Sequence, residues 1–345
     1  MNAISNPSVN AGRAVSDKSF ILLTAITVSG FIAAALSNLW FPQIADVKIT
    51  PYPLFDNAAT LNINQAYRLA LLGLILLYIG TALFSWSDPD RRKRFKKRAP
   101  FRVAVGLALA LWDILGTKLL LLPQPFFPGP ARIVEAFLME NDYIMKNTLY
   151  SLRLFAVGFI LGTFFGVCTG VLIGWFPKVY YWVYPVLKVC GVIPAVAWMP
   201  FALTMFPKPF SAAVFLIIVC MWFPVATLTA AGISSTPKVF FEVARTMGAK
   251  NSYLIFHVTI PHAMPSIFTG IGTATAFAFL TLVMAEMMGQ PGGLGYYINA
   301  SRVWSAYYKV FAAILVMAVL FSAIMYLIGL AEARMLRWRK GLVRS

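Results

Sequence analysis

The sequence predicts an all-α fold, a bundle of helices that crosses a membrane several times. Hydrophobic residues make up 60% of the 345 residues and charged residues only 12%, against roughly 25% charged in a soluble protein. The apolar residues also gather in runs of about 20, enough for a helix to cross about 30 Å of hydrocarbon. Because these runs do not alternate with polar residues, they favour helices over a β-barrel. A water-soluble enzyme is excluded.

Eight apolar windows follow one another along the chain, and we expect each to form one membrane helix. They cover residues 20–41, 66–86, 101–122, 148–175, 180–206, 210–232, 263–288 and 307–330. The first window continues through Trp40 and Phe41, so we expect a retained helix rather than a cleaved signal peptide. The first two windows form a hairpin that precedes a core of six helices.

Basic residues are concentrated in alternate connecting segments. The densest run comprises Arg91, Arg92, Lys93, Arg94, Lys96, Lys97 and Arg98. Because lysine and arginine mark cytoplasmic segments, we expect both termini in the cytoplasm. We interpret the run as a topology anchor that touches anionic lipid, with a nucleic-acid site as the weaker alternative.

Two connecting features depart from plain membrane helices. Residues 123–147 begin with prolines and continue as a short amphipathic pattern, which predicts an outer loop and a short helix. In the fifth window, Pro185, Pro194 and Pro200 predict an interrupted helix. Lys118 follows Asp113 at a spacing of five; the two could pair or face opposite sides, and we expect Lys118 to extend its ammonium toward water.

The polar segment 236–261, between the sixth and seventh windows, predicts a helix, a turn and a second helix. Thr236 can cap a helix whose first turn contains Pro237, and Gly248 can end it. Ser252 can start a short second helix that Pro261 ends. The first helix is amphipathic. Its apolar face holds Phe240, Val243, Ala244 and Met247, and the opposite face holds Lys238, Glu242 and Arg245.

An exposed patch of phenylalanine and methionine is unfavourable in water, so the apolar face requires a partner. Packing against the protein's own helices or the lipid surface is as good an interpretation as docking of another protein.

The same segment resembles the EAA loop of binding-protein-dependent ABC importer permeases, whose usual form is E-A-A-x3-G-x9-I-x-L-P. The matching residues are Glu242-x-Ala244, then after three residues Gly248, then after nine residues Val258-x-Ile260-Pro261. The departures, at Val243, Val258 and Ile260, keep the apolar character.

Further motifs extend the resemblance over residues 101–336. They are Leu122-Pro-x-Pro125, Ser151-Leu-x5-Gly158-Phe, Ala285-Glu286 and Gly293-Leu-Gly295. These motifs resemble the nitrate, sulfonate, taurine and bicarbonate branch of the family. Residues 1–100 lie outside the resemblance.

The resemblance implies a type I importer fold in the bacterial inner membrane, moving a small anion such as a sulfonate, taurine or nitrate. Two permease subunits, here expected to be a homodimer, would form the pathway. Two ATPase subunits would bind ATP and Mg, and a periplasmic binding protein would deliver the solute. The coupling to the ATPases would involve Phe240, Glu242, Val243, Ala244, Met247, Gly248, Ile260 and Pro261.

The sequence shows no chemistry that would make this chain an enzyme. It has no G-x-x-x-x-G-K-[ST] phosphate loop, so we expect no cofactor in this chain and ATP hydrolysis by its partners. His257 and His262 stand five apart, a spacing that does not place both on one helix face, so we expect no metal site. The three cysteines, Cys168, Cys190 and Cys220, lack the spacing of a zinc site.

Ionisable residues and breaks within membrane helices are candidates for the substrate pathway. We select Trp198, Glu286, Arg153 and Pro194. For Glu286 the family match favours a structural or gating role over direct contact with the solute.

The expected domains are residues 1–100, an accessory hairpin with a basic loop; 101–147, the first core helix and an outer loop; 148–334, the transport domain; and 335–345, a basic tail. The main alternative function is a channel or ion-coupled transporter without ATPase partners, and a membrane enzyme is a distant third. Neighbouring genes for an ATPase and a binding protein would favour the importer.

Overall fold

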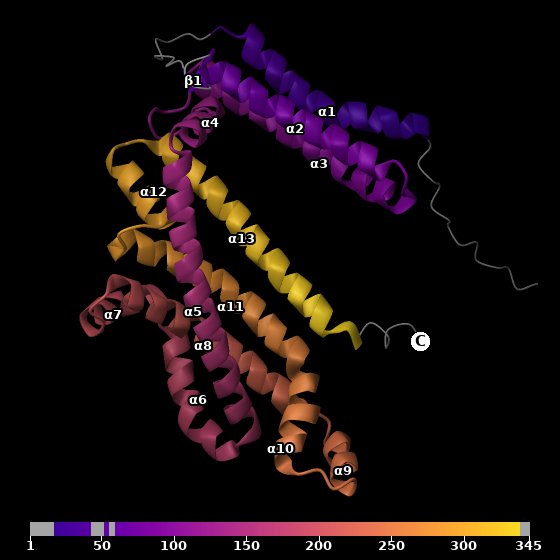
Figure 1. The fold of residues 1–345 in the computed structure, drawn as a ribbon, viewed down its shortest axis with the longest axis vertical. Helices are drawn as coiled ribbons and strands as arrows, with labels where there is room; N and C mark the ends of the chain where they lie inside the picture. Colours follow the sequence, from indigo (N-terminus) through magenta and orange to yellow (C-terminus); the bar gives the residue numbers. More distant parts are fainter. Residues whose placement is uncertain (1–16, 43–51, 55–58, 339–345) are drawn as a thin grey trace, which may run out of the picture. The chain divides into compact units, whose positions relative to one another are not determined.

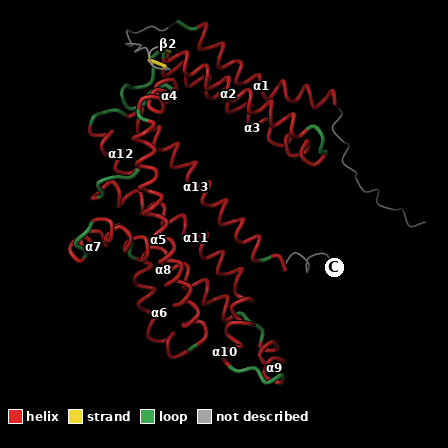
Figure 2. The backbone as a smooth tube through the Cα atoms, in the orientation of Figure 1, coloured by secondary structure: helices red, strands yellow, loops and turns green. Residues whose placement is uncertain are grey.

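A computed structural model describes residues 17–42, 52–54 and 59–338 of the chain. These residues are almost entirely helical, apart from one short pair of strands (Figure 2). Among the described residues, seven helices are long and apolar enough to cross a membrane, and a sharply bent pair would make an eighth. The predicted all-α membrane bundle is confirmed. Most of the predicted basic tail, residues 339–345, lies outside the described residues.

The chain divides into two compact units, Met1–Met139 and Glu140–Ser345. Residues 101–139 therefore group with the two helices before them, and the domain boundaries expected from sequence stay a prediction. The first unit contains α1 (Asp17–Trp40), β1 (Tyr52–Leu54), β2 (Ala59–Leu61), α2 (Ile63–Ser85), α3 (Pro89–Asp113), the π-helical turn η1 (Ile114–Lys118) and α4 (Pro130–Met139). The strands pair antiparallel, with Tyr52 opposite Leu61. Helix α4 is the short amphipathic helix expected after the proline-rich loop.

Within the first unit, α1 packs closely on α3 and a buried polar cluster joins their ends. A Cβ at Gly106 would lie 2.5 Å from the carbonyl carbon of Gly30, so the two backbones touch. The Asn38 amide donates to a carboxylate oxygen of Asp113 at 2.8 Å. Lys118 is also buried, at 4% exposure, because the π-helical turn returns it into the unit. The expectation that Lys118 reaches water is wrong.

The second unit holds the remaining elements. They are α5 (Asn141–Trp175), α6 (Pro177–Val192), the 3-10 turn η2 (Ala195–Trp198), α7 (Met199–Met205), α8 (Pro209–Ser234), α9 (Lys238–Thr246), α10 (Asn251–Tyr253), the π-helical turn η3 (Leu254–Thr259), α11 (Ile260–Gly289), α12 (Leu294–Val303) and α13 (Tyr307–Met335). Helix α8 packs against α5 and α11, which run beside it (Figure 1).

Glycines on α5, spaced four residues apart, let α8 approach closely. The stripe comprises Gly158, Gly162, Gly166, Gly170 and Gly174. Added Cβ atoms at these positions would lie under 3.0 Å from atoms of α8, including Ile217, Met221 and Val225. In lipid, helices gain packing energy from such close approach of their backbones. This contact fixes the centre of the second unit.

We expect Gly170→Val to destabilise the second unit by about 1–3 kcal/mol, because a well-packed contact cannot accept added atoms. The new Cβ would lie 2.5 Å from the Cβ of Thr229 and 2.7 Å from the carbonyl oxygen of Ala226. Thermal unfolding of the purified protein measures the effect. Gly272→Val is the control, since a Cβ at Gly272 meets nothing within 4 Å. Equal melting temperatures for the two variants would contradict the close contact.

The fifth predicted window is a pair of helices bent by 99°, not one straight span. Pro194 stands at the break, immediately before η2, and Pro200 lies in the first turn of α7. Pro185 lies inside α6 without ending it. The predicted interruption is confirmed at Pro194, because proline lacks the N–H that a continuous helix requires. Pro200 does not interrupt the chain's path, since residues 195–205 continue as one arm of the bent pair.

Candidate functional site

Helix α9 begins one residue later than the sequence analysis expects. Pro237, with extended backbone angles, is its N-cap residue and no side chain caps it. Thr236 is buried and its hydroxyl has no hydrogen-bond partner among the described residues. The predicted cap at Thr236 is therefore wrong, because Pro237 keeps an extended ψ of 136° and the helix begins only at Lys238.

Gly248 ends α9 as predicted, and it does so through a left-handed turn. Its φ is +83°, a conformation that costs a residue with a Cβ about 1–2 kcal/mol. The Gly248 N–H donates to the Arg245 carbonyl at 2.9 Å, and the Ala249 N–H donates to the Ala244 carbonyl at 3.0 Å. These two bonds form a Schellman motif, which satisfies carbonyls at the end of the helix.

The segment after Gly248 runs into the next membrane helix without ending at Pro261. Helix α10 follows Lys250, the π-helical turn η3 continues it, and Pro261 lies in the first turn of α11. Residues 251–289 together make one candidate span. The predicted stop at Pro261 is wrong, because the wider π turn accommodates a residue that lacks an N–H. The Thr259 hydroxyl donates to the Leu254 carbonyl at 3.0 Å and stabilises this turn.

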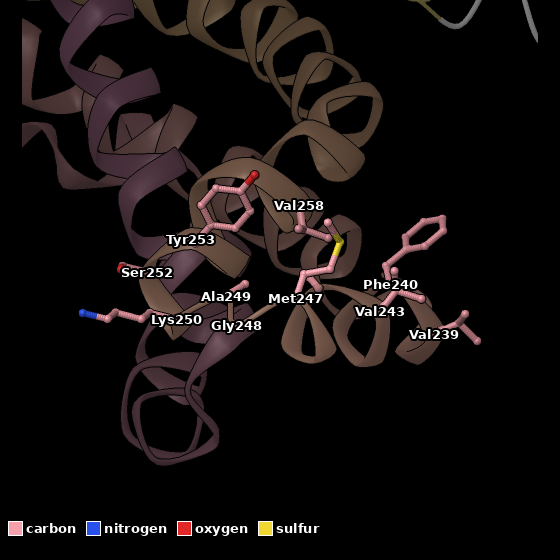
Figure 3. A pocket seen from close by; sticks show the side chains of 11 residues that line it. Val239, Phe240, Val243, Met247, Gly248, Ala249, Lys250, Ser252, Tyr253 and Val258 are labelled. Carbon is pink, nitrogen blue, oxygen red and sulfur yellow. The ribbon is translucent and has the colours of Figure 1, made fainter.

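The apolar face of α9 is left uncovered by the described residues of this chain. Phe240 is 48% exposed, Val243 55% and Met247 83%. Together with α10 and η3, this face encloses a hollow of about 940 Å³. Figure 3 shows Phe240, Val243 and Met247 on α9, and Tyr253 and Val258 on the following segment. The geometry offers a shallow apolar depression beside a rigid helix.

The hollow gathers part of the predicted coupling set. Phe240, Val243, Ala244, Met247 and Gly248 line it. Glu242, Ile260 and Pro261 do not line it; Glu242 and Pro261 are exposed, and Ile260 packs against the main apolar core. The hollow is also lined by residues outside the predicted coupling set, namely Val239, Ala249, Lys250, Ser252, Tyr253 and Val258. Their position in the sequence, on both sides of the turn predicted at Gly248, could have indicated that they lie close to the apolar face of α9.

Aromatic contacts fix the position of α9 from its other side. Phe241 packs edge-on against Trp175 at the end of α5, with ring centroids 5.7 Å apart. His257 stacks on Tyr253, and His262 lies edge-on to Phe240 at 6.1 Å. No group of three metal-binding side chains occurs in the described part of the chain. The two histidines are thus ring partners of Tyr253 and Phe240.

The pathway candidates Pro194, Trp198 and Arg153 lie in different surroundings. Pro194 lines a second hollow, of about 580 Å³, bounded by α6, α8 and α11. This hollow is mainly apolar, and Thr227, Thr273 and Thr281 are part of its wall. The hydroxyls of these threonines donate to carbonyls of their own helices. Trp198 packs against the main core. The Arg153 guanidinium lies 5.4 Å from the ring centre of Phe210, and neither Trp198 nor Arg153 lines that hollow.

Glu286 holds a loop of the protein itself. It is 1% exposed, and one of its carboxylate oxygens accepts the Gly295 N–H at 2.8 Å. The same loop is bound from α5, since Asn147 accepts the Gly293 N–H at 2.9 Å and Ser151 accepts the Leu294 N–H at 2.8 Å. The Gly293-Leu-Gly295 motif thus connects α11, α12 and α5.

Comparison of the sequence with known proteins identifies the family of this chain. Residues 158–337 match the family model described as "Binding-protein-dependent transport system inner membrane component". The aliphatic sulfonates transport permease protein SsuC of Bacillus subtilis is 32% identical over 73% of this chain and 93% of its own length. The nitrate import permease protein NrtB of Synechococcus elongatus is 30% identical over 63% of this chain and 79% of its own length.

Among solved structures, one of the inward-facing MetNI methionine ABC transporter is 21% identical, covers 56% of this chain and 95% of that chain, and has a TM-score of 0.47. The family assignment depends on the sequence matches: a family model that covers more than half of the chain, and a relative matched over nearly its whole length. The chain belongs to the family of binding-protein-dependent transport system inner membrane components, the membrane permeases of ABC importers.

Proposed function

We propose that this permease couples to two ATPase subunits through residues 236–261, with α9 as the coupling helix. The ATPases bind ATP and Mg, a second copy of this chain completes the pathway, and a periplasmic binding protein delivers the solute. The chain lies in the bacterial inner membrane with both termini in the cytoplasm, as its basic segments favour. No cofactor is assigned to this chain itself.

The observation that carries this proposal is the uncovered apolar face of α9 at the position of the EAA spacing. A short helix with an exposed apolar face fits a groove in a partner protein. Because the Schellman turn at Gly248 ends α9 and Phe241, near the middle of the helix, contacts Trp175 of α5, movement of a docked ATPase is passed to α5 and α11. Rigid-body closure of the ATPases then moves the bundle.

Disulfide cross-linking tests the docking. Met247→Cys is placed in a Cys168→Ser background, since Cys168 is exposed, and co-expressed with an ATPase that carries a cysteine in its groove. We expect an oxidant to join the two chains from Met247→Cys and not from Lys238→Cys, on the opposite face. Equal cross-linking at both positions, or at neither, would contradict the proposed face.

For the solute, we propose a small anion of the sulfonate or nitrate class, supported by the names of the relatives. We place the pathway of this chain beside the hollow at Pro194, whose threonine hydroxyl oxygens can accept hydrogen bonds from the water that accompanies a solute. Trp198 and Arg153 are retained as candidate pathway residues that do not line this hollow.

We propose that Glu286 is a positioning residue, which holds the loop at Gly295 in place. We expect Glu286→Gln to keep the apparent KM for the solute and most of the maximal uptake rate, because its amide oxygen can still accept the Gly295 N–H. Glu286→Ala leaves that buried N–H unpaired, which costs about 1–3 kcal/mol, and should lower both the maximal uptake rate and the melting temperature. A KM raised by both variants at an unchanged maximal rate would instead indicate direct contact with the solute.

A further inference from the structure

The first unit carries a hollow outside the matched family region, at the basic end of α2 and α3. It has a volume of about 780 Å³ and is lined by Tyr78, Arg94, Lys97, Arg98, Phe101 and Arg102. We propose that this hollow binds the phosphate group of an anionic phospholipid. The earlier interpretation of this run is a diffuse topology anchor; the structure assigns a defined site to only part of it.

Helix geometry selects which basic residues form the site. At about 100° per residue, Arg94, Lys97, Arg98 and Arg102 share one side of α3. Lys93 and Lys96 are exposed on the same helix but do not line the hollow. None of the described residues that line it is acidic, so the positive charge of its wall is left for an anion to neutralise.

Arg102 is held in place as a donor. Its guanidinium carbon lies 4.4 Å from the ring centre of Phe95 and 4.9 Å from that of Tyr78, which restricts its motion. Its Nη1 is buried and has no hydrogen-bond partner among the described residues. A buried donor without an acceptor costs free energy, and a phosphate oxygen in the hollow would supply that acceptor. Arginine suits this role because its planar donors match phosphate geometry.

The surroundings favour a lipid over free phosphate. Both α2 and α3 are candidate membrane spans, and the basic residues stand at the polar end of the α3 span. Phe101 is part of the wall and is 73% exposed, and Leu77, next to Tyr78, is 58% exposed. A phosphodiester in the hollow would thus leave its acyl chains beside apolar side chains, the arrangement found where basic pockets between membrane helices bind lipid headgroups.

The test titrates purified full-length protein with phosphatidylglycerol and counts bound lipids by native mass spectrometry. The variant Arg94→Gln/Arg98→Gln removes two charges from the hollow. The matched control, Lys93→Gln/Lys96→Gln, removes two charges from the same helix outside it. We expect the first to weaken binding roughly tenfold or more, since it removes charge-assisted hydrogen bonds. The control should weaken binding by less than about threefold, because exposed charges outside the hollow attract the lipid only through screened, long-range electrostatics.

Two further arms complete the test. Arg98→Lys keeps the positive charge but removes the planar set of guanidinium donors. It should therefore still weaken lipid binding, with a melting temperature equal to that of the wild type as the control for folding. Inorganic phosphate in excess should fail to displace the lipid. Equal loss of lipid binding in the two double variants would overturn the site, and leave only diffuse attraction. Displacement by inorganic phosphate alone, or by an oligonucleotide at equal concentration, would overturn the lipid assignment.

Discussion

Replacing Gly248 by aspartate is expected to leave the protein in the membrane at wild-type abundance and to uncouple it from its ATPases. A Cβ at Gly248 meets nothing within 4 Å, so the new side chain clashes with no neighbouring atom. The positive φ and a negative charge at the end of α9, where the helix dipole is also negative, each disfavour the turn. Docking would also have to desolvate this charge, which costs several kcal/mol.

The measurement is ATP hydrolysis by the reconstituted complex with and without the loaded binding protein, together with solute uptake. Gly248→Asn is the matched control, because asparagine has the same shape, carries no charge and tolerates the left-handed conformation. We expect the aspartate variant to lose at least about tenfold in stimulated hydrolysis and the asparagine variant to keep most of it. Wild-type stimulation and uptake by Gly248→Asp would remove Gly248 from the coupling site.

The membrane bundle could be predicted from sequence because lipid allows few alternatives. A run of about 20 apolar residues must satisfy its own backbone, so the windows translate almost directly into helices. The sharp bend at Pro194 could also be predicted from the sequence, because proline removes a backbone hydrogen-bond donor from a helix. The continuation of the helix through Pro261 could not be predicted, because it depends on a π turn that no composition rule indicates.

The candidate site could be predicted in part. The helical spacing of Phe240, Val243 and Met247 predicts a shared face, and Gly248 predicts the turn. Whether the protein itself covers that face depends on tertiary packing, which periodicity cannot supply. The structure leaves the face exposed and uses Phe241 instead for the internal contact with Trp175. The burial of Lys118 likewise depends on the fold of the first unit.

Truncating both Phe240 and Met247 to alanine is expected to weaken the complex with the ATPase by about 2–4 kcal/mol, roughly two orders of magnitude in the dissociation constant. Both side chains are largely exposed in this chain, so the loss falls on the interface and not on the permease core. Large apolar side chains at the centre of an interface contribute most of its binding energy. Affinity is measured between the purified ATPase and the permease in nanodiscs.

The double variant Lys238→Ala/Arg245→Ala is the control, because it shortens two exposed side chains on the opposite face of α9, neither of which lines the hollow. It should change affinity by less than about 1 kcal/mol, the usual size of exposed charge effects. Since Phe241 and Trp175 keep α9 in place in both variants, a difference between them reports which face docks. If the charged-face variant lost more affinity than the apolar-face variant, the ATPase would engage the opposite side of the helix.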